Sequence, residues 1–250
     1  MRKPKLSILI PVKNEGANLK IILKIIQAIV DTPHEILVVY DSIDDGSIPA
    51  IKELNKGNPS IKPVHNKMGN GVINAIKSGV NAASGDYVLV MAADDIGPVL
   101  IIEQMLSLMG KGYDFISATR YAYGGKNIGG VFASRALSKI ANALFHMLTG
   151  SQFTDSTLGV KMFRRSIFNK LALEAKPIGW AVAFEMSIKA HLLGLRIKEV
   201  PVISINRFCG FYGGKSSFKL NWVFEYLKWF FWGLKKLNSG KIISFQNSHK

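Results

Sequence analysis

The feature that most constrains the fold is an alternation of short apolar runs and amphipathic segments over residues 1–120. The apolar runs are rich in aliphatic side chains and occupy residues 6–10, 35–39, 87–91 and 115–118. Between them, residues 19–30, 72–83 and 99–109 repeat apolar positions at helical spacing. Continuous apolar strands separated by helices are typical of a mostly parallel sheet with helices on both faces. The sequence therefore predicts an α/β fold.

The remainder of the chain predicts further elements but no second independent domain. Residues 131–148 and 181–193 show helical periodicity, and residues 196–205 show a strand pattern. The glycine-rich residues 124–130 predict a mobile connection. We find no internal repeat and no long linker, so the sequence indicates one large domain, residues 1–217, followed by a distinct C-terminal segment, residues 218–250.

The C-terminal segment is unusually aromatic. Eight aromatic residues lie between Phe218 and Trp232, among them three of the four tryptophans of the chain, with lysines nearby. The longest uncharged run within it, residues 229–234, is too short to span a bilayer. Aromatic side chains beside lysines suit the membrane interface, which predicts amphipathic interfacial helices inserted through Trp222, Trp229 and Trp232. The alternative to membrane insertion is that this segment forms a helix packed on residues 1–217.

The charge of the chain calls for an acidic partner. With 32 Lys and Arg against 17 Asp and Glu, the formal net charge is +15, and phosphorylated substrates, anionic lipid or nucleic acid would each match it. No nucleic-acid recognition motif accompanies the charge, so we expect no nucleic acid as a partner. The first strand is not followed by Gly-x-Gly-x-x-Gly, which argues against a Rossmann dehydrogenase.

The location of the protein is predicted from its N-terminus and its cysteine content. Only seven uncharged residues, 6–12, separate Lys5 from Lys13, which is too short a run for a signal peptide. The single Cys209 excludes an intramolecular disulfide and fits a reducing compartment. We therefore expect a cytoplasmic protein that is peripheral on an anionic membrane surface.

Acidic residues gather where the predicted strands end. Three such loops occupy residues 11–15, 41–47 and 92–95, and a fourth lies downstream at residues 155–157. Asp and Ser are ordinary turn residues, so one loop alone would indicate little. In an open α/β sheet, however, ligands bind beyond the carboxyl ends of the strands, where these loops meet. The pattern predicts a ligand site at this edge.

Six motifs in order resemble those of the inverting family 2 glycosyltransferases, specifically the dolichyl- or polyprenyl-phosphate sugar synthases. The matching residues are Pro11, Asn14 and Glu15; Val38–Asp41 with Asp45–Ser47; Ala83–Tyr87; Thr119–Tyr121 with Gly124 and Gly125; Asp155–Lys161; and Arg207 with Gly214–Ser216. The resemblance covers about residues 5–220. It implies the nucleotide-diphospho-sugar transferase (GT-A) fold, with interfacial helices at the C-terminus.

The same resemblance implies a donor site. It places the nucleotide of the sugar donor against Pro11, Asn14, Glu15, Asp41 and Asp45, with Asp41 accepting hydrogen bonds from the base.

The resemblance also implies a divalent cation, Mg²⁺ or Mn²⁺, on the diphosphate, held by Asp94 and Asp95. A hard cation with oxygen ligands suits a diphosphate leaving group. One departure affects this loop, because the first acid of the family's Asp-x-Asp motif is Ala92 here, and Tyr40 replaces an acid upstream. Either the remaining oxygens complete the site, or the chain is a catalytically silent nucleotide-sugar-binding protein.

The acceptor implied by the resemblance is a polyprenyl phosphate, dolichyl or undecaprenyl. A phosphate monoester has a second pKa of about 6 and is already ionised at neutral pH, so it needs cationic partners rather than a base. The resemblance assigns these to Arg120, Arg135, Arg207 and Lys215. For a saccharide hydroxyl acceptor in cell-surface glycan synthesis, the alternative, Glu185 is the candidate base.

Overall fold

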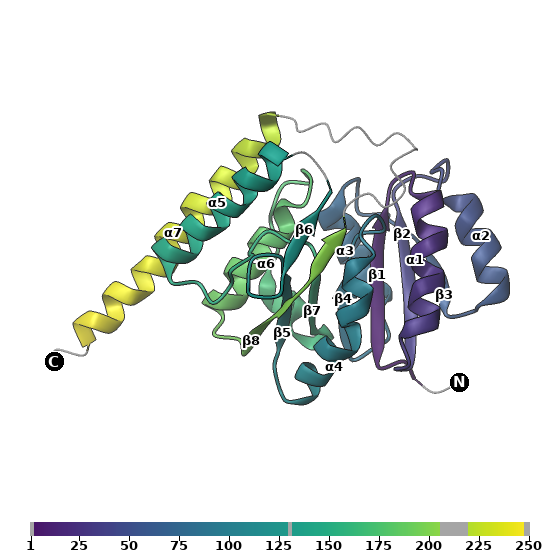
Figure 1. The fold of residues 1–250 in the computed structure, drawn as a ribbon, viewed down its shortest axis with the longest axis horizontal. Helices are drawn as coiled ribbons and strands as arrows, with labels where there is room; N and C mark the ends of the chain where they lie inside the picture. Colours follow the sequence, from purple (N-terminus) through teal and green to yellow (C-terminus); the bar gives the residue numbers. More distant parts are fainter. Residues whose placement is uncertain (1–2, 130–131, 206–219, 248–250) are drawn as a thin grey trace.

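The structure is a computed structural model that describes residues 3–129, 132–205 and 220–247 (Figure 1). Its strands are β1 Leu6–Val12, β2 His34–Tyr40, β3 Ile61–His65, β4 Tyr87–Val90, β5 Phe115–Thr119, β6 Lys126–Ile128, β7 Lys161–Arg164, β8 Ile197–Pro201 and β9 Ile203–Ile205. Its α-helices are α1 Gly16–Ile29, α2 Ile48–Gly57, α3 Val72–Ala82, α4 Ile102–Gly110, α5 Phe132–Thr149, α6 Ala181–Leu192 and α7 Leu220–Asn247. Two 3₁₀ helices are η1 Gly97–Ile101 and η2 Arg165–Leu171.

A seven-stranded sheet in the order β3-β2-β1-β4-β7-β5-β8 forms the centre of the molecule. All of its strands run parallel except β7, which lies antiparallel between β4 and β5. The chain order reverses between β1 and β4, so the carboxyl ends of these two strands mark the topological switch point. A small parallel pair, β6 with β9, lies outside the main sheet.

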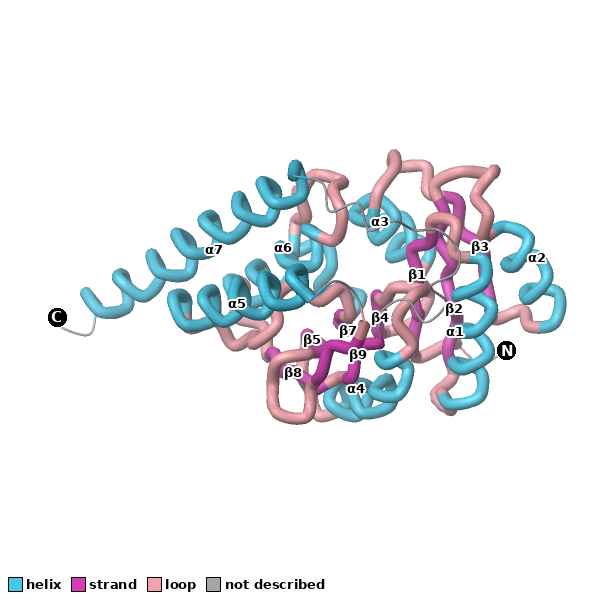
Figure 2. Tube along the Cα trace, turned by 45° about the horizontal axis from the view of Figure 1, so that its top comes forward, coloured by secondary structure: helices cyan, strands magenta, loops and turns pink. Residues whose placement is uncertain are grey.

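Helices cover both faces of the sheet, as the apolar runs predicted. One core packs the sheet against α1, α2 and α4, and the other packs it against α3, α6 and the buried sides of α5 and α7. The two helices α5 and α7 lie side by side at the end of the molecule away from α1 and α2 (Figures 1 and 2). The predicted GT-A-type α/β architecture is confirmed.

Three details differ from the sequence predictions. Residues 124–130 were expected to form a mobile connection, but they contain β6, which gains a partner in β9 from a distant part of the chain. The strand pattern at residues 196–205 divides into β8 and β9. The C-terminal segment forms one helix, α7, rather than several, and its neighbours are α5 and α6.

Close packing joins α7 to the rest of the molecule. A Cβ added to Gly233 would lie 2.8 Å from Ile188 of α6 and 2.9 Å from Phe145 of α5, so a larger residue there would displace these side chains. Trp229 is 3% exposed and belongs to the main core. Helix α7 therefore shares the core of the residue 1–217 region, and the division into two domains at residue 217 stays a prediction.

Candidate active site

The four acidic loops of the sequence meet at one edge of the sheet. Strands β1, β2, β4 and β5 are parallel, so the residues that follow them emerge at the same side. Strand β7 runs the opposite way, and the loop at residues 155–157, which precedes it, reaches this side too. The site predicted from the loop positions thus forms at the carboxyl edge, around the switch point between β1 and β4.

The side chains of Asp45 and Asn14 join the loops that follow β1 and β2. The carboxylate of Asp45 accepts from the backbone N–H of Asn14 at 3.0 and 3.1 Å and from that of Ser47 at 2.8 Å. In return, Asn14 Oδ1 accepts from the N–H of Gly46 at 2.8 Å. The N–H of Glu15 donates to Ser47 Oγ at 2.8 Å. Three residues predicted to bind the sugar nucleotide, Asn14, Glu15 and Asp45, therefore lie together. The Asp45 carboxylate stabilises the two loops through their backbone N–H groups.

Asp41 occupies the next position along this edge. Its Oδ1 accepts from Asn66 Nδ2 at 2.7 Å, and its Oδ2 accepts from the N–H of Gly71 at 2.9 Å. Gly71 has φ of 103°, and a Cβ there would lie 2.6 Å from Pro177, so the loop before α3 depends on glycine at this point. Pro11 lies half-buried in β1, opposite Val39 of the β2 strand that leads to Asp41.

The two candidate metal ligands have different surroundings. Asp95 is 4% exposed and points toward β9: its Oδ1 accepts from the N–H groups of Gly97 and Ile205, and its Oδ2 accepts from the Ser204 hydroxyl. Asp94 is half-buried beside it. Among the described residues, no three His, Cys, Asp or Glu side chains lie close enough to hold a metal by themselves.

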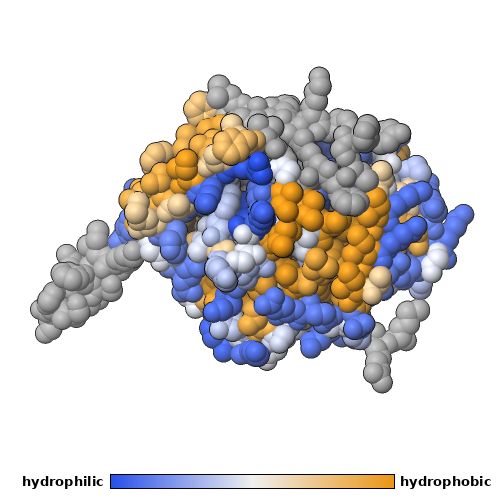
Figure 3. Space-filling view, in the orientation of Figure 1, coloured by the Kyte–Doolittle hydropathy of each residue, from blue (hydrophilic) through white to orange (hydrophobic). Residues whose placement is uncertain are grey.

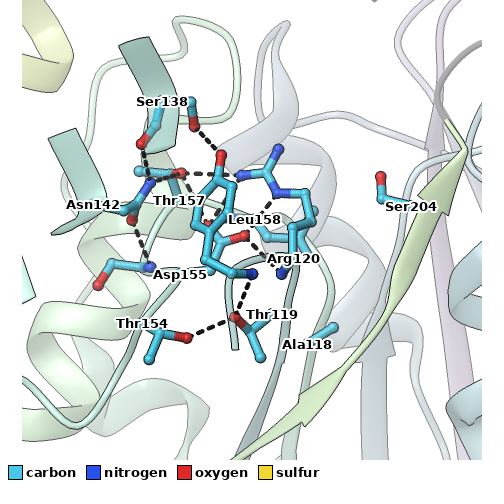
Figure 4. Close-up of polar contacts among 12 residues, drawn as sticks. Ala118, Thr119, Arg120, Ser138, Asn142, Thr154, Asp155, Thr157, Leu158 and Ser204 are labelled. Carbon is cyan, nitrogen blue, oxygen red and sulfur yellow. Dashed lines mark hydrogen bonds and ion pairs between the residues drawn. The ribbon is translucent and has the colours of Figure 1, made fainter. Parts of the chain in front are cut away.

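Arg120, which follows β5, forms a bidentate ion pair with Asp155 (Figure 4). Its Nε lies 2.7 Å from Oδ2 and its Nη2 lies 3.0 Å from Oδ1. Burial opposes the charged form of both groups, but their mutual attraction outweighs burial, lowering the pKa of Asp155 and raising that of Arg120. Asp155 is fully buried, whereas the Arg120 side chain is 12% exposed. A fixed guanidinium thus lies at the site edge.

Arg135 of α5 lies near the same loops. Its Nη1 donates to the Asn127 carbonyl at 3.1 Å, and its buried Nε has no hydrogen-bond partner among the residues that the structure describes. Asn127 is aligned with Ser204 in the β6–β9 pair, and Ser204 donates to Asp95. The structure therefore connects the arginine of α5 to the loop after β4.

Glu185 does not have the environment expected of a general base. It is fully buried in α6, its carboxylate lies 2.7 Å from Lys189 Nζ, and it accepts from the N–H groups of Glu174 and Ala175. These contacts to a cation and two backbone donors fix the loop before α6. The structure gives Glu185 this structural role. Arg207 and Lys215 lie outside the described residues.

Two charged residues near the site were not among the predicted site residues, although Lys161 ends one of the matched motifs. Glu199 of β8 accepts from the N–H and hydroxyl of Thr154 at 2.9 and 2.7 Å, and from the N–H of Asp155 at 3.1 Å. Lys161 begins β7, is fully buried, and donates to Ser117 Oγ at 2.7 Å. Both interrupt apolar strand patterns, which is the signal that a search for buried charge would use.

The fold and the carboxyl-edge site together define a GT-A-type glycosyltransferase architecture. Among solved structures, the chain resembles glucosyl-3-phosphoglycerate synthase from Mycobacterium tuberculosis in complex with Mn²⁺, UDP and glucosyl-3-phosphoglycerate, with a TM-score of 0.64 and 19% identity over 82% of this chain and 72% of that one. Another structure of that synthase contains Mg²⁺ and UDP and gives a TM-score of 0.61 at 21% identity, over 82% and 72% of the two chains.

Residues 7–172 match the family described as Glycosyl transferase family 2, and the chain belongs to that family. It is 29% identical to a dolichol-phosphate mannosyltransferase of Pyrococcus furiosus over 90% of this chain and 62% of that protein. It is 28% identical to a polyprenol monophosphomannose synthase of Mycolicibacterium smegmatis over 81% of this chain and 78% of that protein. The chain thus spans less than two thirds of the Pyrococcus relative's length.

Proposed function

We propose that the protein transfers a sugar from a nucleotide-diphospho-sugar to a polyprenyl phosphate, with inversion at the anomeric carbon. The observation that carries this proposal is that the arginines of the site adjoin an exposed apolar helix. Arg135 belongs to α5 itself, and Tyr121, next to Arg120, donates its hydroxyl to Ser138 of α5 at 2.9 Å. A lipid phosphate needs these two surfaces together, because its head is anionic and its tail is apolar. The names of the relatives point to the same acceptor class.

In this reaction, a phosphate oxygen of the acceptor attacks the anomeric carbon while the bond to the nucleotide diphosphate breaks. The acceptor oxygen is already anionic, so no protein base has to remove a proton. Arg120 and Arg135 would hold the acceptor phosphate in line with the bond that breaks, since guanidinium groups bind phosphate through paired N–H donors. The burial of Glu185 accords with this mechanism.

A divalent cation fits the site only when the donor contributes ligands. Mg²⁺ usually binds through one or two carboxylates together with substrate phosphates and water, which matches Asp94 with a diphosphate. Bound there, the cation would neutralise the charge that develops on the leaving diphosphate. Asp95 would then act by holding the loop against β9, since its two oxygens already accept from Gly97, Ser204 and Ile205.

The membrane surface expected from the sequence takes a different form in the structure. Of the three tryptophans predicted to insert, Trp229 is buried, whereas Trp222 lies half-buried beside Gly179 and Trp232 lies half-buried against the core. The exposed apolar side chains on the two helices are instead Phe132, Leu137, Ile140, Leu144, Met147 and Leu148 of α5 and Phe224, Leu227 and Phe231 of α7. From Leu137 to Met147 on α5 and from Phe224 to Phe231 on α7 they recur every three or four residues, which places them in stripes, and apolar surface gathers over α5 in Figure 3.

We propose that these stripes dock on an anionic bilayer. Exposed lysines flank them, namely Lys139 on α5 and Lys228, Lys235 and Lys236 on α7, and such residues are attracted to anionic headgroups. Within the described residues, neither helix has the combination of length and hydropathy that a membrane span requires. The proposed contact is therefore peripheral, and it would deliver the acceptor phosphate to the arginines near the start of α5.

The experiment that tests the function is a screen of UDP- and GDP-sugars with undecaprenyl phosphate or dolichyl phosphate in detergent. Formation of a lipid-linked sugar supports the proposal. Transfer to a saccharide hydroxyl alone would favour the alternative glycosyltransferase reaction. Donor binding without transfer or hydrolysis, in the presence of Mn²⁺ or Mg²⁺, would identify a silent binding protein, which the alanine at position 92 makes a specific rival.

A further inference from the structure

The acceptor side of the site rests on a row of residues that crosses three strands, of which Lys161 and Ser117 are buried and Glu199 is half-buried. In the sheet register, Lys161 of β7 is opposite Ser117 of β5, and Ser117 is opposite Glu199 of β8. Residues opposite one another on adjacent strands project from the same face of the sheet, close enough to interact. Lys161 donates to the middle member, Ser117, at 2.7 Å. A cation and an anion thus flank one hydroxyl beneath the site.

Lys161 has few hydrogen-bond partners for a buried ammonium group. Besides Ser117, its Nζ lies 3.5 Å from the Ser156 carbonyl and 5.3 Å from the ring centre of Phe153. Burying a charge is costly unless other charges compensate it. The charges that compensate Lys161 are the carboxylates of Asp155 and Glu199, whereas Arg120 repels it.

The two carboxylates connect Lys161 to the site in two steps, first through Glu199 and then through Asp155. Glu199 accepts from the N–H groups of Thr154 and Asp155, which fixes the loop that carries the Asp155 carboxylate. Asp155 in turn holds the guanidinium of Arg120. The four groups Arg120, Lys161, Asp155 and Glu199 carry two positive and two negative charges, so removal of any one leaves an excess charge in a buried cluster.

We propose that Lys161 and Glu199 are positioning residues: Glu199 holds the loop that carries Asp155, Lys161 balances the charge of the two carboxylates, and together they hold the Arg120 guanidinium where the acceptor phosphate binds. This inference rests on the proposed function for the identity of the acceptor. Neither residue is required to touch substrate.

Four variants test the inference: Lys161→Met, Glu199→Gln, the double variant with both changes, and Lys198→Met as the control. Lys198 is an exposed lysine next to Glu199 on β8, so its variant removes the same charge by the same substitution outside the cluster. For each protein, KM is measured for undecaprenyl phosphate and for the active sugar nucleotide, and the midpoint of thermal unfolding is measured without substrates.

Each single variant is expected to raise the KM for undecaprenyl phosphate about tenfold or more, the cost of misplacing one charge-assisted contact. The KM for the sugar nucleotide should stay near the wild-type value in each single variant. In the control Lys198→Met, both KM values should stay near those of the wild type. The double variant, which restores equal numbers of positive and negative charges, should recover most of the acceptor KM, and its shift in thermal midpoint should differ from the sum of the two single shifts. Such recovery is the signature of coupled residues.

The inference is overturned if the two single effects add in the double variant, or if both KM values rise together. Should Lys161→Met fail to fold, Glu199→Gln carries the same test. With one attractive charge removed, Lys161 should lose its proton more readily, so acceptor KM should begin to rise at lower pH than in the wild type. An unchanged pH profile would contradict the inference. If the wild type transfers nothing to undecaprenyl phosphate, the proposed function fails while the thermal cycle still tests the coupling.

Discussion

On the donor side of the site, the loops after β1 and β2 are held by carboxylates that accept hydrogen bonds from backbone N–H groups. Asp45 and Asp41 both act in this way, and neither is paired with a cationic side chain in the contacts described above. On the acceptor side, the loops around Arg120 are held by buried ions facing one another. The first arrangement holds the backbone of the loops after β1 and β2, whereas the second holds the charged guanidinium of Arg120. The donor side should therefore respond to lost hydrogen bonds, and the acceptor side to changes in charge.

The largest effect is expected at Asp94, where the proposed cation would join the two sides across the diphosphate. Asp94→Asn should abolish turnover, because the neutral amide is a poor ligand for a hard cation. Turnover should be measured with added Mg²⁺ or Mn²⁺ and after treatment with EDTA. Ala92→Asp should keep or strengthen the metal affinity. Full activity of Asp94→Asn, together with full wild-type activity in EDTA, would remove the cation from this loop.

Arg120→Met tests the acceptor side directly. It should lower kcat/KM for the lipid phosphate about a hundredfold or more, because the acceptor loses a fixed cationic donor. It should also lower the free energy of unfolding by about 3–5 kcal/mol, since Asp155 is left buried without its partner. Kinetics and denaturant titration measure the two effects. Arg196→Met, which removes an exposed arginine from its contact with Asp114, should change neither substantially.

Asp41→Ala tests the donor side. Binding of the sugar nucleotide should weaken by about 1–3 kcal/mol, because the base loses an acceptor and the Gly71 loop loses its anchor. Calorimetry of donor binding measures the change, and the acceptor KM should stay close to the wild-type value. Unchanged donor affinity would remove Asp41 from the donor site.

The pH response should separate the two sides. Burial lowers the pKa of Lys161 to about 8. The carboxylates of Asp155 and Glu199 raise this pKa, whereas Arg120 lowers it further. Lys161 is therefore charged below pH 8 and loses its charge above it. Acceptor KM should rise from pH 7 to pH 9, by up to about tenfold as the charged fraction falls to roughly a tenth. Donor KM should remain level over the same range.

The same shift has an opposite consequence for stability. The folded protein binds this proton less tightly than the unfolded chain, whose lysine has a pKa of 10.5. The charged lysine is thus a stability penalty below pH 8, and that penalty disappears as pH rises toward 10.5. Unfolding measured across this range in the wild type and in Lys161→Met should show the difference. Identical pH dependences would contradict the assignment.

The smallest effects are expected on the membrane surface. Lys228→Ala or Lys235→Ala should each weaken binding to anionic vesicles by about 1 kcal/mol, and less at high salt. Leu137→Asp or Ile140→Asp should weaken it more, because apolar contact is expected to supply most of the affinity. Co-sedimentation at low and high salt measures both. If the full-length protein stays in the supernatant throughout, α5 and α7 do not dock on lipid.

Much of the fold could be predicted from the sequence because its signals are local. The aliphatic runs gave β1, β2, β4 and β5 nearly at their observed bounds. By contrast, β6 was missed, because three residues form a strand only through a partner far along the chain. Helix α2 buries only Ala50 and Ile51, too few to produce a clear periodic signal.

The candidate site was predictable in position but less so in residue roles. Acids at strand ends indicated the correct edge of the sheet, yet an acid that binds backbone, such as Asp45, has the same sequence signature as one that binds a ligand. The direction of a side chain on α7 was equally hidden, because Trp229 and Phe231 are both aromatic and only packing shows that one is buried and the other exposed.

The exposed stripe of α5 has a kinetic consequence under the proposed function. A polyprenyl tail that stays in the bilayer reaches the site by lateral diffusion, so encounters depend on how many acceptors share the surface with each bound protein. Turnover should then follow the mole fraction of lipid phosphate in a vesicle rather than its total concentration. Adding inert phospholipid at constant acceptor concentration would slow the reaction, although no inhibitor had been introduced.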